Sequence, residues 1–167
     1  SGKEQSKKIG DFFKKNQIPI DLVISSEWCR CKETTSIAFK NFETKNFLNS
    51  FYSAKFAKNR KSQMKNLKKY VDNWNKNKNL VFVTHYVVIL EALNYAPNSG
   101  EIVIADTNFK KIGNIKVDYW KLCHQKELWD KRKNKLTLSI EAILLIINLR
   151  KKIKILLRKR KKINFHF

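Results

Sequence analysis

Cysteine, proline and glycine are scarce in this sequence, which holds three, two and four of them in 167 residues. Three cysteines make no even framework, and only Cys29 and Cys31 lie close together, so the pattern does not indicate a secreted disulfide scaffold. A Cys-x-Cys pair with three scattered histidines also falls short of the ligand spacing of a metal site. We therefore expect reduced thiols, no bound metal and no other cofactor.

Acidic residues are few as well: 14 of them stand against 36 lysines and arginines, for a formal net charge of +22. The excess is uneven. The first 120 residues carry 21 basic and 11 acidic side chains, a net of +10, whereas the last 47 carry 15 and 3, a net of +12. Such a tail predicts non-specific attraction to nucleic acid or to an anionic membrane through residues 121–162, although no base-reading motif accompanies it.

Long hydrophobic runs are missing too. No signal peptide opens the chain, and the apolar segment around Ile143–Leu149 is too short to predict a membrane span, so we expect a cytoplasmic protein. We interpret residues 139–157 as one helix, apolar first and basic afterwards, that packs on the domain or lies on an anionic surface. The alternative is that the tail is not a selected sequence, for example read-through past a displaced stop codon.

What the chain does contain is an alternation of helical and extended patterns over residues 1–118. Three- and four-residue steps of apolar side chains, and short apolar runs, predict the elements. The expected helices cover residues 3–16, 30–40, 60–76 and 86–93, and the expected strands cover 20–25, 80–84, 101–106 and 111–118. This order predicts an α/β fold with helices covering a sheet, followed by a separate tail over residues 119–167.

Polar and charged residues follow two of the expected strands. Arg30 lies in the turn between the strand at 20–25 and the next helix, where a helix N-terminus favours an anion and a forked guanidinium suits a phosphate. His85 ends the strand at 80–84. Ligands of open α/β sheets bind beyond the carboxyl ends of the strands, so we expect Arg30 and His85 to share a site. Ser26 is either a further phosphate ligand or a cap of the turn.

These residues resemble those of a known family. The segment Ser25-Ser26-Glu27-Trp28-Cys29-Arg30-Cys31-Lys32-Glu33-Thr34, followed by Val83-Thr84-His85, is similar to motifs of the histidine phosphatase superfamily, the phosphoglycerate mutase-like enzymes. Weaker similarities to the family lie before, between and after these motifs. They are Gly2-Lys3-Glu4-Gln5 with Ile9-Gly10, Leu48-Asn49-Ser50-Phe51, and Ser99-Gly100-Glu101-Ile102-Val103. The resemblance covers roughly residues 1–118.

The resemblance implies a three-layer α/β/α fold with a mostly parallel sheet, and phosphotransfer through a phosphohistidine intermediate. In the family a first histidine, in an Arg-His-Gly or Arg-His-Ala motif that ends the first strand, attacks phosphorus. A second histidine and arginines hold the phosphoryl oxygens, where charge develops in the transition state. His85 matches the second histidine and Arg30 matches a pocket arginine, so both are expected to be catalytic and phosphate-binding residues for a small phosphorylated substrate.

One part of the family pattern is missing. Neither Arg-His-Gly nor Arg-His-Ala occurs in these 167 residues, and His124 and His166 lie in the tail, beyond the resembling region. The chain begins where the family's first helix begins, so we expect the first strand to be missing. We then expect no phosphate-ester turnover by this chain, and an open sheet position that the segment around Ile143–Leu149 is a candidate to fill.

Several alternatives stay open at this stage. Glu43 and Glu91 are both available as a general acid, and nothing in the sequence singles out either one. The chain is a truncated histidine phosphatase domain, a pseudo-enzyme that binds phosphorylated ligands without chemistry, or a basic binding module for nucleic acid or anionic membrane. The substrate and the oligomeric state have no signature in the sequence.

Overall fold

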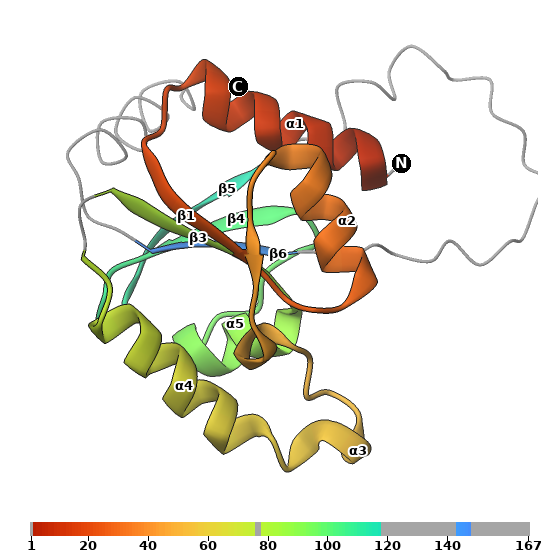
Figure 1. The fold of residues 1–167 in the computed structure, drawn as a ribbon, viewed down its shortest axis with the longest axis vertical. Helices are drawn as coiled ribbons and strands as arrows, with labels where there is room; N and C mark the ends of the chain where they lie inside the picture. Colours follow the sequence, from red (N-terminus) through yellow and green to blue (C-terminus); the bar gives the residue numbers. More distant parts are fainter. Residues whose placement is uncertain (1, 76–77, 118–142, 148–167) are drawn as a thin grey trace, which may run out of the picture.

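A computed structural model describes residues 2–75, 78–117 and 143–147 of the chain (Figure 1). The helices are α1 (Gly2–Lys15), α2 (Cys29–Ala38), α3 (Ala54–Ala57), α4 (Arg60–Asp72) and α5 (Tyr86–Leu93), with a 3-10 turn η1 at Asn46–Leu48. The strands are β1 (Ile20–Ser25), β2 (Glu43–Thr44), β3 (Asn79–Thr84), β4 (Glu101–Ala105), β5 (Lys111–Lys116) and β6 (Ile143–Ile147). The described chain is thus a mixed α/β fold, and the helices and strands predicted within residues 1–118 are confirmed in type and order.

The described strands form one sheet in the order β2-β1-β3-β6-β4-β5. β1 pairs in parallel with both β2 and β3, whereas β4 and β5 form an antiparallel hairpin. β6 is antiparallel to β3 and parallel to β4. The sheet is therefore mixed, with parallel pairing among β2, β1 and β3 and between β4 and β6. β4 and β5 are antiparallel because a short turn joins them, and a short turn can only connect antiparallel strands.

Helices lie on both faces of this sheet. Figure 1 shows α1 and α2 on one face and α4 and α5 on the other. Each face has its own apolar cluster: one gathers around Phe82 with α4 and α5, and the other around Val81 and Val83 with α1 and α2. β3 supplies both clusters because its side chains alternate between the faces and all six of its residues are buried. This explains the near-continuous apolar run of β3 in the sequence.

Gly10 sets the distance between the two helices on the first face. A Cβ at this position would lie 2.6 Å from the backbone oxygen of Ala38, at the end of α2. Because that neighbour is backbone, it cannot rotate away, and any side chain would push α1 off α2. The glycine therefore permits the close packing of α1 on α2 that buries Ile9 and Phe13.

The helix predicted over residues 139–157 is wrong where the structure describes that range. Residues Ile143–Ile147 form strand β6 between β3 and β4, and the remainder of the range lies outside the described residues, as do 121–142. A short run rich in isoleucine suits either a strand or a buried helix, so the pattern alone was ambiguous. Backbone pairing favours the strand over the helix, because β6 forms hydrogen bonds with the backbone groups of β3 on one side and of β4 on the other. β6 thereby joins the sheet formed by the strands of residues 1–118.

Two smaller features concern the segment 41–53, which lies between two of the expected helices, and the end of a helix. The segment contains the two-residue strand β2 and the turn η1. The helix expected to end at residue 76 ends at Asp72, although Trp74 beyond it is still buried. In the described part of the chain, no helix combines the length and the apolar character needed to cross a membrane.

Candidate functional site

The carboxyl ends of β1 and β3 bring Ser26 and His85 together. β1 and β3 are adjacent and parallel, with Ser25 opposite Val83, and the Ser26 N–H continues the ladder by donating to the Val83 carbonyl at 2.9 Å. The Ser26 Oγ lies 2.9 Å from the His85 Nε2. Both residues are buried, and His85 is only 3% exposed. The two strand ends thus lie next to each other, as the sequence predicted, and the role of the residues there stays a prediction.

Hydrogen bonds define the tautomer of His85. The Asn49 amide is oriented by two bonds: its Nδ2 donates to Glu27 Oε2 at 2.8 Å, and its Oδ1 accepts from the Glu27 N–H at 2.9 Å. The Ser26 hydroxyl lies 2.8 Å from that same Oδ1, which can only accept, so Ser26 donates to Asn49. The Ser26 Oγ must then accept from His85 Nε2–H. The imidazole proton is therefore on Nε2, and Nδ1 carries the free lone pair.

A cavity of about 580 Å³ opens beside His85. Arg30 and His85 lie in the same wall, which confirms their predicted proximity. Ser26, fully buried, is not part of the wall, so it acts as a positioning residue for His85. The residues that line the cavity are Trp28, Arg30, Ser50, Tyr52, Ser53, His85, Tyr86 and Val87.

Arg30 lies in the first turn of α2, as predicted, and its positive charge is not neutralised by the described part of the chain. Among the described residues, no carboxylate forms an ion pair with Arg30, and its Nε is buried without a hydrogen-bond partner. Arg30 instead contacts an aromatic ring: its guanidinium carbon lies 5.3 Å from the centre of the Trp28 ring. A half-buried guanidinium held on an aromatic face, with no counter-ion, attracts an anion into the cavity.

Burial lowers the pKa of His85 to about 4, and the neighbouring Arg30 charge lowers it in the same direction. At neutral pH the imidazole is therefore uncharged, and its Nδ1 is buried without a partner in the described part of the chain. A buried polar atom with no partner is rare in folded proteins and is typical of functional sites. An anion beside Arg30 would remove one of the two causes that hold the pKa down.

Cys31 lies against the same imidazole, with its Sγ 3.6 Å from His85 Nε2. Burial raises the pKa of the Cys31 thiol to about 12, against the opposing effects of Arg30 and Ser26. Because only the thiolate is nucleophilic, Cys31 is not the nucleophile of a Cys-His pair at neutral pH. This buried, protonated thiol fits the expectation of reduced thiols.

Two helix N-termini meet at the cavity. Trp28 and Arg30 belong to the start of α2, while Tyr86 and Val87 are the first two residues of α5. The first N–H groups of a helix have no acceptor within the helix, and the helix dipole makes this end positive. Together with Arg30, both ends create a positive potential in the cavity, which suits phosphate, sulfate or carboxylate.

The two carboxylates considered as general acids lie elsewhere. Glu43 forms an ion pair with Lys45 at 3.2 Å, and Glu91 pairs with Arg60 at 2.7 Å. Neither lines the cavity. Their contacts are those of ordinary surface ion pairs, so the structure offers no support for a catalytic role of either residue.

Sequence reasoning assigned no role to three residues that shape the site. Asn49 and Glu27 orient Ser26, and Trp28 packs edge-on against the His85 ring with the centroids 5.0 Å apart. Asn49 lies in the segment Leu48-Asn49-Ser50-Phe51, but no local pattern reveals that its side chain reaches a residue 23 positions away. Only its pairing with Ser26 across the sheet edge identifies its role.

His85 is the only histidine in the described part of the chain, because His124 and His166 lie outside it. Within the same residues, no group of three His, Cys, Asp or Glu side chains is arranged to hold a metal ion. Comparison of the chain with protein-family models, with curated proteins and with solved structures finds no match. The function must therefore be argued from the geometry of the cavity.

The lowered pKa of His85 makes the stability of the fold depend on pH. An unfolded histidine titrates near 6.5, whereas the folded one titrates at about 4, so stability is complete above about pH 6.5 and falls as pH drops toward 4. We expect a loss of about 2–3 kcal/mol from this group over that range. Urea unfolding at steps of half a pH unit measures it, with His85→Gln as the control because it removes the titration. Equal slopes for the two proteins between pH 6.5 and 5 would contradict the prediction.

Proposed function

We propose that this chain binds phosphate monoesters in the cavity at the carboxyl ends of β1 and β3, as part of a histidine phosphatase-like site. A single observation carries the proposal. The Arg30 guanidinium, with no counter-ion among the described residues, and the buried His85 imidazole, whose Nδ1 has no partner there, line one cavity between two helix N-termini. A phosphate supplies the negative charge that Arg30 lacks among the described residues.

The fold supports the same proposal. Helices on both faces of a mixed sheet are compatible with the three-layer arrangement of the phosphoglycerate mutase-like enzymes, whose first strand is central. In this chain β6 takes a central position. Its amino end lies beside Thr84 and its carboxyl end beside Leu80, so the carboxyl end of β6 points away from the edge that holds His85. β6 therefore does not deliver a residue to the cavity in the way that a strand parallel to β3 would.

In this proposal the phosphate is held and oriented, but it is not transferred. A phosphohistidine mechanism needs a second histidine in line with the phosphorus, and no Arg-His-Gly or Arg-His-Ala segment occurs in the 167 residues. Arg30 and His85 perform the binding half of the chemistry, charge neutralisation and hydrogen bonding of the phosphoryl oxygens. We expect no hydrolysis of phosphate esters by this chain.

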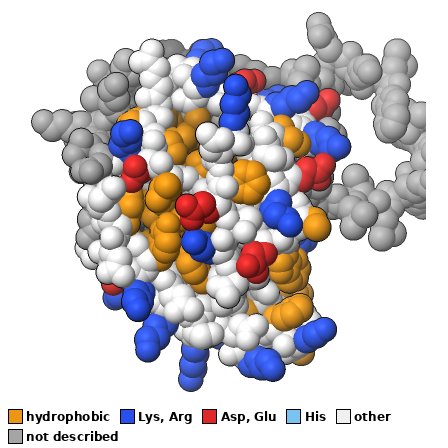
Figure 2. Space-filling view, viewed as in Figure 1, with side chains coloured by type: hydrophobic (Ala, Val, Ile, Leu, Met, Phe, Trp, Pro, Cys, Tyr) orange, Lys and Arg blue, Asp and Glu red, His pale blue; other side chains and the backbone are white. Residues whose placement is uncertain are grey.

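The basic-module alternative rests on residues 121–162, of which the structure describes only 143–147. On the face of the described domain in Figure 2, lysines and arginines are spread mainly over the periphery, with acidic side chains between hydrophobic groups in the middle. That face has no continuous basic surface of the kind that tracks a nucleic-acid backbone. This face of the described domain therefore gives no support to the basic-module alternative.

Replacing Arg30 tests the proposal. Isothermal titration of inorganic phosphate and glycerol phosphate into Arg30→Ala is expected to show affinity about 10–100-fold weaker than for the unmodified chain, since charge-assisted hydrogen bonds are lost. Arg60→Ala is the matched control, because Arg60 pairs with Glu91 and does not line the cavity. Its phosphate affinity should change by less than about twofold. Equal phosphate binding by the two variants would rule out Arg30 as the anion ligand.

A further inference from the structure

We infer that the ligand of this cavity is a phosphate monoester that carries a planar aromatic group, either a phenyl-type ring or a nucleobase. The inference rests on the proposed phosphate site and specifies the remainder of the ligand. Three of the eight residues that line the cavity are aromatic: Trp28, Tyr52 and Tyr86. The volume of about 580 Å³ is in the range of pockets that hold organic ligands, so it has space for more than a phosphate.

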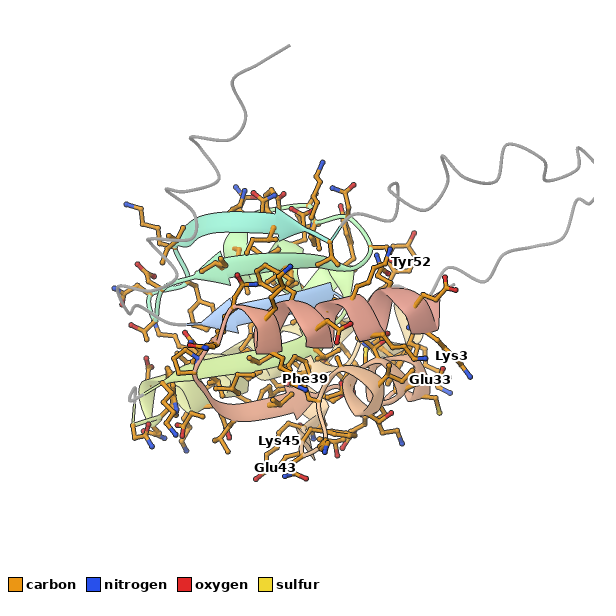
Figure 3. The ribbon with its side chains drawn as sticks, turned by 90° about the horizontal axis from the view of Figure 1, so that it is seen from above. Lys3, Glu33, Phe39, Glu43, Lys45 and Tyr52 are labelled. Carbon is orange, nitrogen blue, oxygen red and sulfur yellow. The ribbon has the colours of Figure 1, made fainter. Side chains whose placement is uncertain are left out.

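Tyr52 is the clearest sign of an aromatic ligand. Its side chain is 83% exposed, the most exposed of the large hydrophobic side chains in the described residues, yet it lines the cavity. No ring contact or side-chain hydrogen bond of Tyr52 with the described residues accounts for its position. Figure 3 shows it at the same end of the molecule as Lys3 and Glu33. An uncovered ring at the mouth of a polar site offers a stacking surface for a ligand ring.

Trp28 is held in position before any ligand binds. Its ring packs edge-on against His85, with the centroids 5.0 Å apart, and against Phe56, with the centroids 5.9 Å apart. Arg30 lies over the same ring. A ring fixed by contacts of this kind loses little conformational entropy when a ligand stacks on it. Trp28 also joins the two halves of the site, because the ring that forms the apolar wall supports the phosphate-binding guanidinium.

The wall of the cavity contains few side chains that could bind the hydroxyl groups of a sugar. Besides Arg30 and His85, the wall contains Ser50 and Ser53, and the Ser50 hydroxyl already accepts from the Tyr52 N–H at 3.3 Å. Among the lining residues there is no carboxylate, asparagine or glutamine, the side chains that usually bind several sugar hydroxyls. Val87 and the aromatic rings form the rest of the wall. The surface beyond the phosphate is therefore apolar and aromatic.

Isothermal titration with four probes tests the inference: inorganic phosphate, glycerol phosphate, phenyl phosphate and adenosine monophosphate. We expect phenyl phosphate or adenosine monophosphate to bind about tenfold more tightly than glycerol phosphate, which has the same charge and no ring. The phenyl and adenosine arms distinguish a ring bonded directly to the phosphate from one that is separated by a sugar. Tyr52→Ser should reduce this preference to about twofold or less and leave the affinity for inorganic phosphate unchanged.

Leu90→Ser is the matched control, because Leu90 is the other exposed large hydrophobic residue of the described chain and does not line the cavity. It should leave the preference for the aromatic probes unchanged. Equal affinity for glycerol phosphate and both aromatic probes overturns the inference while the phosphate site stands. An aromatic preference that persists in Tyr52→Ser overturns the assignment to Tyr52. If none of the four probes binds, the proposed function itself fails.

Discussion

Replacing Leu145 by proline is expected to break the sheet at its centre and to lower the free energy of unfolding by about 3 kcal/mol or more. Leu145 lies opposite Phe82 of β3 and Val103 of β4, at the middle of the only strand that joins those two in the described sheet. Proline has no N–H to donate to a ladder and is confined to edge strands and bulges. The change therefore separates β2-β1-β3 from β4-β5.

The size of this effect follows from the backbone groups of β3 and β4 that pair with β6. β3 and β4 are buried along their whole length, so backbone groups freed by the loss of β6 have little access to water and remain unpaired. A domain is stable by only about 5–15 kcal/mol, so the loss is a large fraction of the total. Urea unfolding measured by circular dichroism gives the change, and hydrogen exchange should show faster exchange of amide protons in β3 and β4.

Leu145→Val is the control for Leu145→Pro, because valine keeps the N–H and suits a strand. Its unfolding free energy should lie within about 1.5 kcal/mol of the unmodified chain. If Leu145→Pro had the same unfolding midpoint as Leu145→Val, β6 would not be an integral strand of the sheet.

Replacing Glu101 by alanine is expected to cost about 3 kcal/mol or more, although Glu101 lies outside the cavity. The side chain of this residue, which is 1% exposed, accepts four hydrogen bonds. They come from the Tyr95 hydroxyl at 2.6 Å, from the Asn98 N–H at 2.8 Å, from Asn98 Nδ2 at 2.9 Å and from Asn114 Nδ2. The carboxylate thus ties the segment after α5 to the first residue of β4 and to β5. Alanine would leave these donors without their acceptor.

The pKa of Glu101 also makes the stability of the fold depend on pH. Burial alone would raise it, but the hydrogen bonds from Asn98, Tyr95 and Asn114 outweigh burial and hold the pKa below its usual value. A folded pKa below the unfolded one stabilises the fold above the unfolded pKa, near 4.5, and this stabilisation is lost as the pH falls further. The Glu101 window begins near pH 4.5, in the lowest part of the His85 window, so measurements between pH 6.5 and 5 report on His85 without a contribution from Glu101.

Glu33→Ala is the matched control for Glu101→Ala. Glu33 forms an exposed ion pair with Lys3 at 3.2 Å, and exposed pairs contribute little. We expect a change within about 0.5 kcal/mol, measured by urea unfolding at pH 7. If Glu101→Ala were equally mild, the hydrogen bonds would not hold the hairpin to the segment before it.

Much of the fold within residues 1–118 could be predicted because its elements carry local patterns. Leu67 and Val71 of α4 are buried, as the helical period of apolar side chains predicts for residues 60–76, and the apolar run of β3 is a buried central strand. Arg30 and His85 were found from their places after two strands, since the carboxyl ends of adjacent parallel strands meet at one edge. Each of these inferences used neighbours in sequence.

Other features depend on partners that are distant in the chain. The strand β6 was misread because Ile143–Ile147 suits a strand or a helix equally, and only the backbone groups of β3 and β4 decide between them. The role of Asn49 and the aromatic wall around Tyr52 also left no local pattern. The sequence alone thus determined the order of helices and strands within residues 1–118 and the two phosphate-binding candidates. The tertiary structure decided the pairing of β6, the tautomer of His85 and the cavity, because each is made of contacts between segments that only folding brings together.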